Sequence, residues 1–405
     1  MTGGERTSAA RHPTSLAPLY AAGFVTAFGA HAVASSAGAQ AAGGGGAVLL
    51  RLGLLVAVYD LAEVFLKPVF GALADRVGPK RVVLWGLVGF GAVSVTGCLV
   101  PGTTALIAVR FGQGASAAAF SPAASAAVGR LAAPGARGRY FGRYGSWKSL
   151  GYAAGPVLGA ALVGAGGLAL LQGVLAAVAL LAALWVLLRC PTIEPLPRRR
   201  ATIVDTIRGA TSWSFLQPVV VLAATAGALV AAVAFLPSAA ARSGSGLVAA
   251  ASIASVIALA SSLSQPLAGR WMDQGRLTFR RTAPVSLLCC AAGVLVAAIS
   301  PSFPALIAAA VLIGLGVGVG TPVAYATLAA RTHPAELGRT MGAAELGREL
   351  GDAGAPTLVG VASAAAGSAV GLLALGLGLL LTTAVALLPA GRSDEGEAAG
   401  ARIPG

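Results

Sequence analysis

Three ionisable residues share one face of a helix inside an apolar stretch of the sequence. Asp60, Glu63 and Lys67 follow the spacing i, i+3 and i+7, and the residues between them are Leu, Ala, Val and Phe. Helical spacing of this kind places the three side chains together. Ionisable groups within a membrane are costly and normally pair, so this face indicates either proton transfer or buried ion pairs.

A second charged face lies in the last quarter of the chain. It has the same helical spacing and consists of Glu345, Arg348, Glu349 and Asp352. Arg110 and Lys148 are further cations within apolar stretches. Two interpretations are open: the acids exchange protons in competition with a cationic or amphiphilic substrate, or the charges form static salt bridges that join two parts of the protein. Under the first, Asp60 and Asp352 are the predicted proton carriers because they lie nearest mid-span.

The composition indicates an integral membrane protein. Of its 405 residues, 57% are hydrophobic and 10% are charged, whereas soluble domains carry about 25% charged residues. A polar start runs directly into a full-length apolar span, so we expect no cleavable signal peptide. The four cysteines lack metal-ligand spacing, and no phosphate-binding loop or HExxH motif is present. We therefore expect no enzyme activity, no metal and no cofactor, with a proton gradient as the driving force.

The cations indicate how the chain lies in the membrane. Apolar runs broken by Pro, Gly and charge predict about twelve transmembrane helices, among them separate spans centred near Tyr152 and Ala177. Lys and Arg gather in the links after every second helix: Arg76, Lys80, Arg81, Arg130, Arg137, Arg139, Arg189, Arg198, Arg199, Arg200, Arg208, Arg276, Arg280, Arg281 and Arg331. Arg51 and Arg242 are the exceptions. This asymmetry predicts that both termini are cytoplasmic and explains the net charge of +14 without nucleic-acid binding.

The predicted fold class is all-α integral membrane, with two pseudo-symmetric six-helix bundles. A polar stretch after the sixth helix divides the chain. The expected parts are a cytoplasmic N-terminal tail (1–15), an N-terminal bundle (16–188), a central cytoplasmic loop (189–213) with a short interfacial helix at 203–210, a C-terminal bundle (214–390) and a disordered tail (391–405).

The two halves of the sequence repeat each other. The stretch from Lys67 to Asp75 matches the stretch from Gln265 to Asp273 at an offset of 198 residues. Further matches at an offset of 200 are Pro122 with Pro322, Pro134 with Pro334, Gly138-Arg139 with Gly338-Arg339, and Pro156 with Pro356. Two parallel repeats are typical of transporters whose substrate site lies near the midplane between the halves.

A turn motif follows the first charged face. It reads Gly-Ala-Leu-Ala-Asp-Arg-Val-Gly and contains Gly71, Asp75, Arg76 and Gly78, and a degenerate copy contains Gly269 and Asp273. Glycine allows close approach of two helices. A carboxylate such as Asp75 can accept hydrogen bonds from the free N–H groups at the start of a neighbouring helix. We predict that this motif is a latch on the cytoplasmic side.

With this motif the sequence resembles the major facilitator superfamily over nearly its whole length. The resemblance implies the family's fold, in which helices 2 and 11, and helices 5 and 8, are neighbours across the two halves. This chain departs from the family's pattern at one point. Pro79 stands where the family usually has a basic residue, and Gly129-Arg130 offers no acid to pair with one.

Two further motifs carry the resemblance. The stretch Arg110-Phe111-Gly112-Gln113-Gly114 is similar to the family's helix 4 motif, whose Arg bears on proton coupling in proton-coupled members. A structural pair with a neighbouring helix is the alternative. In helix 5, Gly151, Gly155, Pro156 and Gly159 match a motif that marks the family's antiporters, above all drug/proton exporters. The alternative there is plain close packing of a glycine stripe.

The sequence therefore predicts a secondary active transporter that exports a small amphiphilic or drug-like molecule by alternating access, against proton flow. A uniporter or proton symporter for a nutrient, and a non-transporting receptor or scaffold on the same fold, are the alternatives. His31, Gln113, Tyr144 and Tyr152 are candidates to line the cavity, although a packed core histidine is the favoured interpretation of His31. We expect a monomer in the inner (plasma) membrane, with membrane lipid and the substrate as its partners.

Overall fold

The computed structural model describes residues 16–40, 46–99, 103–133, 135–195, 211–242, 244 and 247–388. Within these residues the regular structure is helical throughout. The predicted tails 1–15 and 391–405, the interfacial helix at 203–210, and Arg198, Arg199, Arg200 and Arg208 lie outside the described residues.

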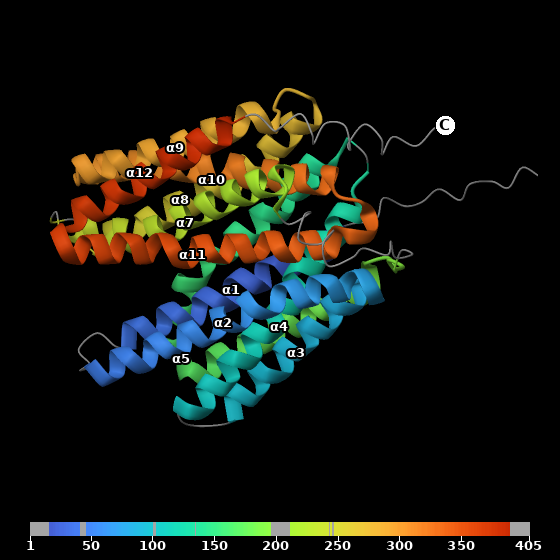
Figure 1. Ribbon diagram of the computed structural model, residues 1–405. Helices are drawn as coiled ribbons and strands as arrows, with labels where there is room; N and C mark the ends of the chain where they lie inside the picture. The colour runs from blue at the N-terminus through green and yellow to red at the C-terminus, as the bar shows by residue number, and fades with distance from the viewer. Residues whose placement is uncertain are drawn as a thin grey trace, which may run out of the picture.

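Two bundles of helices lie against each other, one above the other in Figure 1. The N-terminal bundle contains α1 (Ala17–Gln40), α2 (Gly46–Val77), α3 (Pro79–Leu99), α4 (Thr103–Leu131) and α5 (Arg137–Arg189). The C-terminal bundle contains α7 (Trp213–Arg242), α8 (Leu247–Asp273), α9 (Phe279–Ile299), α10 (Phe303–Arg331), α11 (Leu337–Ala366) and α12 (Ser368–Leu387), with a short 3₁₀ helix at Pro334–Glu336.

Helix α5 folds back on itself. Its 53 residues include two with non-helical backbone angles, Gly166 (φ −154°, ψ 21°) and Gly167 (φ 69°, ψ −171°). The rings of Trp147 and Trp185 lie 6.4 Å apart, whereas a straight helix would separate them by more than ~50 Å. Gly167 has a positive φ that a residue with a side chain adopts only at a cost. The two arms of α5 correspond to the separate spans predicted around Tyr152 and Ala177.

Seven helices in the described part of the chain are long and apolar enough to cross a membrane: α3, α5, α7, α8, α9, α10 and α12. Helices α2 and α11 are as long but fall outside this group, and they carry the two charged faces. Their absence from the group therefore has a local cause. The ionisable residues that mark the candidate site also weaken the signal of a membrane span.

The halves meet through α2 against α11 and through α5 against α8, the two pairs that the family resemblance implies. Within each half, α1 packs on α5 and α7 packs on α11. The glycine stripe of α5 serves this packing. Gly151 lies against the backbone of Phe24 and the side chain of Ala27, and Gly159 lies against the backbone of Ala32.

The stripe predicts a difference between two glycines of the same helix. Replacing Gly151 by Val places its side chain on the backbone of α1, and overpacking of this kind costs about 1–3 kcal/mol. Gly164→Val is the matched control, because nothing lies within 4 Å of a Cβ atom there. We expect a lower thermal unfolding midpoint in detergent for Gly151→Val alone. Equal midpoints for the two variants would contradict the packing role.

Candidate functional site

A cavity of about 270 Å³ lies between the two halves. Its walls come from α1, α2, α4 and α5 on one side and from α7 and α11 on the other. The ionisable residues that line it are His31, Asp60, Glu63, Arg110, Tyr152, Arg348, Glu349 and Asp352. The two charged faces predicted from the sequence therefore meet at one place, together with Arg110 from α4.

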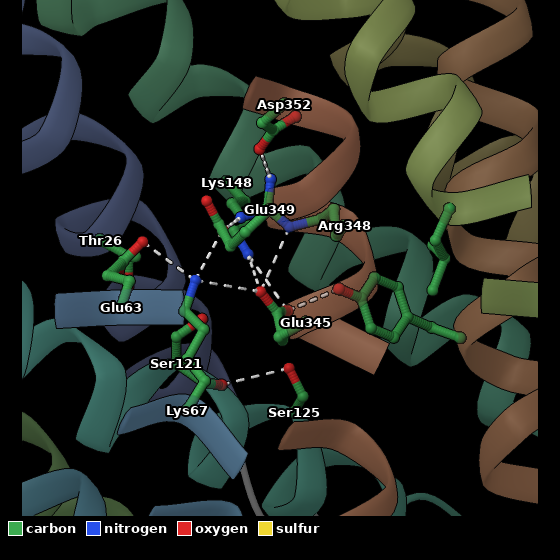
Figure 2. A network of polar contacts seen from close by, with 12 residues as sticks. Thr26, Glu63, Lys67, Ser121, Ser125, Lys148, Glu345, Arg348, Glu349 and Asp352 are labelled. Carbon is green, nitrogen blue, oxygen red and sulfur yellow. Dashed lines mark hydrogen bonds and ion pairs between the residues drawn. The ribbon is translucent and has the colours of Figure 1, made fainter. Parts of the chain in front are cut away.

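A network of ion pairs begins at Lys67, whose side chain is fully buried. Its Nζ lies 2.6 Å from a carboxylate oxygen of Glu349 and 3.0 Å from one of Glu63, and 3.8 Å from one of Glu345. Figure 2 shows Lys67 approaching these acids from α2 while Glu345 and Glu349 come from α11. The shortest contact of this lysine thus joins one half of the protein to the other.

Glu345 is the second centre of the network. Lys148 of α5 donates to both of its carboxylate oxygens, at 3.0 and 3.2 Å. Tyr325 of α10 donates its hydroxyl hydrogen to Glu345 at 2.5 Å. The carboxylate has no exposed surface, so it depends on these partners for stabilisation of its charge.

Arg348 connects the network to the cavity. Its guanidinium contacts Glu345 at 3.2 Å, Asp352 at 2.5 Å and, through Nη2, Glu349. The same group donates to the hydroxyl of Tyr152 at 2.6 Å. One planar side chain thereby fixes three carboxylates of α11 and a tyrosine of α5.

The network is not charge-balanced. Its ion pairs join four carboxylates to three cations: Glu63, Glu345, Glu349 and Asp352 are the acids, and Lys67, Lys148 and Arg348 are the bases. Oε1 of Glu63 and Oδ1 of Asp352 have no hydrogen-bond partner among the described residues. Both residues line the cavity. The two unfilled acceptors therefore belong to carboxylates of residues that line the cavity.

Asp60 stands apart from this network. It lines the cavity and is half-buried, and no ion pair or hydrogen bond joins it to the described residues. Arg110 lies nearby on α4, with its guanidinium 4.1 Å above the ring of Tyr59. It also donates to the side chain of Gln113 at 3.2 Å. Arg110 is thus held by an aromatic face and an amide, both within the N-terminal half.

The turn motif forms the latch contact that the sequence predicts. Asp75 accepts hydrogen bonds from the backbone N–H groups of Gly338 and Arg339, both at 2.8 Å. Its repeat mate Asp273 accepts from Gly138 at 2.8 Å and Arg139 at 2.9 Å. Each carboxylate caps the first turn of a helix in the opposite half, α11 or α5, where the helix dipole favours an anion.

Glycines make this contact possible. Gly71 lies against the carbonyl of Gly338, and Gly269 lies against the carbonyl of Gly138, so that a Cβ atom at any of them would collide with backbone. Arg76 is exposed, and Gly78 has φ +93° at the turn. The two halves are therefore in backbone contact on the side that the cation pattern assigns to the cytoplasm.

Pro79 stands where the family usually has a basic residue, and other cations make contacts in this region. Arg130 at the end of α4 pairs with Asp75 itself at 2.7 Å, so the cation comes from the helix where the family resemblance places an acid. Lys80 donates to the carbonyl of Leu187 at 3.2 Å and to that of Cys190 at 2.5 Å. It thus satisfies carbonyl groups at the end of α5. Spacing alone does not indicate either contact, because the first depends on how α2 and α4 pack and the second on how α3 and α5 pack.

Two of the residues predicted to line the cavity lie elsewhere in the structure. Tyr144 is buried, and its hydroxyl donates to the carbonyl of Ser121 at 3.3 Å. Gln113 is buried between Ser94 and Gln172, each 2.8 Å away. Neither lines the cavity, because partners within the N-terminal bundle satisfy their polar groups. His31 and Tyr152 do line it, with their rings 4.4 Å apart.

Tyr325 is the member of the network that sequence reasoning missed. It lies in an apolar run of α10 with no charged neighbour in the sequence. A tyrosine in a membrane span is usually interpreted as an interface anchor. Only the packing of α10 beside α11 reveals its contact with Glu345.

Comparison with known proteins agrees with this architecture. The family model described as Major Facilitator Superfamily matches residues 19–280 and, again, 219–402. The chain therefore belongs to this superfamily of multi-pass membrane transport proteins.

Among curated relatives, puromycin resistance protein pur8 of Streptomyces alboniger is 38% identical over 109 residues, which cover 27% of this chain and 22% of that protein. The methylenomycin A resistance protein of Streptomyces coelicolor is 34% identical over 148 residues, covering 36% and 31%. The matched part of the chain thus spans less than a third of either relative's length.

Solved structures show the same fold at low identity. The human organic anion transporter MFSD10 (TETRAN) has a TM-score of 0.77 at 17% identity, covering 92% of this chain and 98% of that one. The Escherichia coli fucose:proton symporter FucP has a TM-score of 0.73 at 16% identity, covering 92% and 97%. These likenesses concern the fold alone.

The buried network predicts a strong effect of Lys67→Met on stability. The change leaves Glu63 and Glu349 without their shared cation, and breaking a buried pair costs about 3–5 kcal/mol. Adding Glu63→Gln removes the carboxylate that has no other cation in the network and restores part of the loss. A thiol-reactive dye that reports exposure of the buried Cys190 and Cys290 during heating, above the signal of the partly exposed Cys98 and Cys289, measures the effect. In the control Arg81→Met an exposed cation is removed, and an equal loss there would contradict the network's role.

The latch predicts a difference between its two halves. Asp75→Ala removes two hydrogen bonds to α11 and the pair with Arg130, whereas Asp273→Ala removes two hydrogen bonds to α5. Loss of a helix cap costs about 0.5–2 kcal/mol, so both variants loosen the contact and Asp75→Ala does so more. Spin labels at positions 76 and 333, both exposed, report the distance across the contact. Unchanged distance distributions in both variants and in the double variant would contradict the latch.

Proposed function

We propose that this transporter exports a small amphiphilic or drug-like cation by alternating access, driven by proton entry. The observation that carries the proposal is the carboxylate-lined cavity between the halves, with an ion-pair network that spans both halves at its edge. The proposal includes twelve transmembrane spans, with the two arms of α5 counted separately, and cytoplasmic termini in the plasma membrane.

The geometry supports a specific division of roles. Asp60 and Asp352 line the cavity. Asp60 forms no ion pair or hydrogen bond with the described residues, and Oδ1 of Asp352 has no hydrogen-bond partner among them. They are the proposed sites where protons and a cationic substrate compete. Lys67 and Lys148 face Glu349 and Glu345 across the boundary between the halves. These two pairs must break when the cavity opens on the side of the latch, so they couple access to charge.

Relatives support export. Two of them are named as resistance proteins against puromycin and methylenomycin A, and another is named as a probable actinorhodin transporter of Streptomyces coelicolor. Removal of the compound from the cell is a simple way for a membrane transporter to confer resistance. Export of a drug-like molecule is therefore the direction that best fits this chain, which we propose acts as a monomer.

Proton flux measures the roles of the two aspartates. In proteoliposomes with a pH-sensitive dye inside, a drug-like cation added to the wild type should drive proton movement. We expect Asp60→Asn and Asp352→Asn each to reduce this movement and the double variant to abolish it, because a neutral amide cannot exchange the proton. Glu336→Gln is the control, because its ion pair with Arg339 lies away from the cavity.

Coupled flux retained in both single variants and in the double variant would overturn the role of these aspartates. Substrate flux that needs no proton gradient would instead indicate a uniporter, and proton and substrate movement in the same direction would indicate a symporter. Binding without flux under any gradient would indicate a receptor or scaffold.

A further inference from the structure

A second cavity, of about 360 Å³, lies beside the charged one, between α5, α7 and α8. Its walls include Pro156 from α5, Leu229 and Val233 from α7, and Ala254 and Ala258 from α8. No charged side chain of the described residues lines it. We call it the apolar chamber, and we call the cavity around Asp60 and Asp352 the charged chamber.

Tyr152 is the residue that lines both chambers. Its ring lies edge-on to His31, 4.4 Å away at the charged side, and its hydroxyl accepts a hydrogen bond from Arg348 at 2.6 Å. Helix α7 also borders both chambers: Val230 lines the charged one, whereas Leu229 and Val233 line the apolar one. The chambers are thus neighbours, and the side chain of Tyr152 is their common wall.

The two volumes bear on what fits. Pockets for drug-sized molecules usually measure roughly 300–1,000 Å³, and the charged chamber alone falls short of that range at about 270 Å³. A molecule that carries both a charge and a large apolar body needs the second chamber as well. Tyrosine suits the boundary, because its ring is apolar and its hydroxyl is polar.

We propose that Tyr152 is a specificity-determining residue that seats the substrate across both chambers, with the cationic group in the charged chamber and an aromatic or branched apolar body in the apolar chamber. This inference rests on the proposed function for the charge of the substrate. It adds that affinity for bulky cations depends on the apolar chamber, while small cations bind without it.

Equilibrium binding to purified protein tests the inference independently of transport. The probes are tetraphenylphosphonium, which has a large aromatic body, and tetraethylammonium, which is small, and affinity is measured by isothermal titration calorimetry. Ala254→Leu fills part of the apolar chamber. We expect it to weaken tetraphenylphosphonium binding by about tenfold or more, equal to about 1.4 kcal/mol, and to leave tetraethylammonium binding unchanged.

Variants of Tyr152 test the wall itself. Tyr152→Phe keeps the ring and should preserve the ratio of the two affinities. Tyr152→Ala removes the wall and should change that ratio. Ala298→Leu is the matched control, because it fills a peripheral cavity of about 180 Å³ beside α9 and α12, and it should affect neither probe.

The outcomes separate this inference from the proposed function. Suppose that the wild type binds both probes and that Ala254→Leu keeps the wild-type thermal unfolding midpoint. If Ala254→Leu then weakens the binding of both probes equally, or of neither, the proposed role of the apolar chamber is wrong, whereas the proposed export function still stands. An unchanged affinity ratio in Tyr152→Ala would overturn the role of Tyr152 in the same way. A wild type that binds neither probe would overturn the inference together with the cationic substrate class.

Discussion

A charged side chain removed from water needs an opposite charge, and the rest of this structure depends on where those charges come from. Lys67 and Lys148 belong to the N-terminal half, and the acids that approach them across the boundary, Glu349 and Glu345, belong to α11. Separating the halves there leaves both the lysines and the glutamates without their opposite charges. The ion pairs that stabilise the conformation with the latch formed therefore oppose the opening of the cavity on the latch side. Protonation of a carboxylate is a physical means of weakening these ion pairs.

The latch and the network act at different depths of one interface. At the latch, glycines bring the backbones of α2 and α11 into contact, and Asp75 caps the start of α11. About two turns away along α2, Lys67 reaches Glu349. Because both contacts involve the same pair of rigid helices, a change at one is transmitted to the other without an intervening loop. The pseudo-symmetric copy at α5 and α8 retains the cap through Asp273.

Much of this architecture could be predicted from the sequence. The repeat, the turn motif and the spacing of charges on α2 and α11 are local patterns, and local patterns follow from helical periodicity. The positions of Tyr144 and Gln113 could not be predicted in this way. Both lie on helices that border the cavity, and a rotation of the helix by a fraction of a turn decides whether a side chain faces the cavity or a neighbouring helix. Arg130 and Tyr325 were not predicted as site residues and yet contact carboxylates, because those carboxylates come from other helices.

The sequence by itself determined that this chain is an all-helical membrane protein with two related halves, because hydropathy, charge asymmetry and scarce repeated residues are properties of the chain alone. Only the tertiary structure decided which charges meet, which carboxylate oxygens are left without a partner, and that Tyr152 stands between two chambers. The physical reason is that ion pairing and cavity shape depend on contacts between residues up to 282 positions apart. Such contacts cannot be inferred from the spacing of residues along either helix.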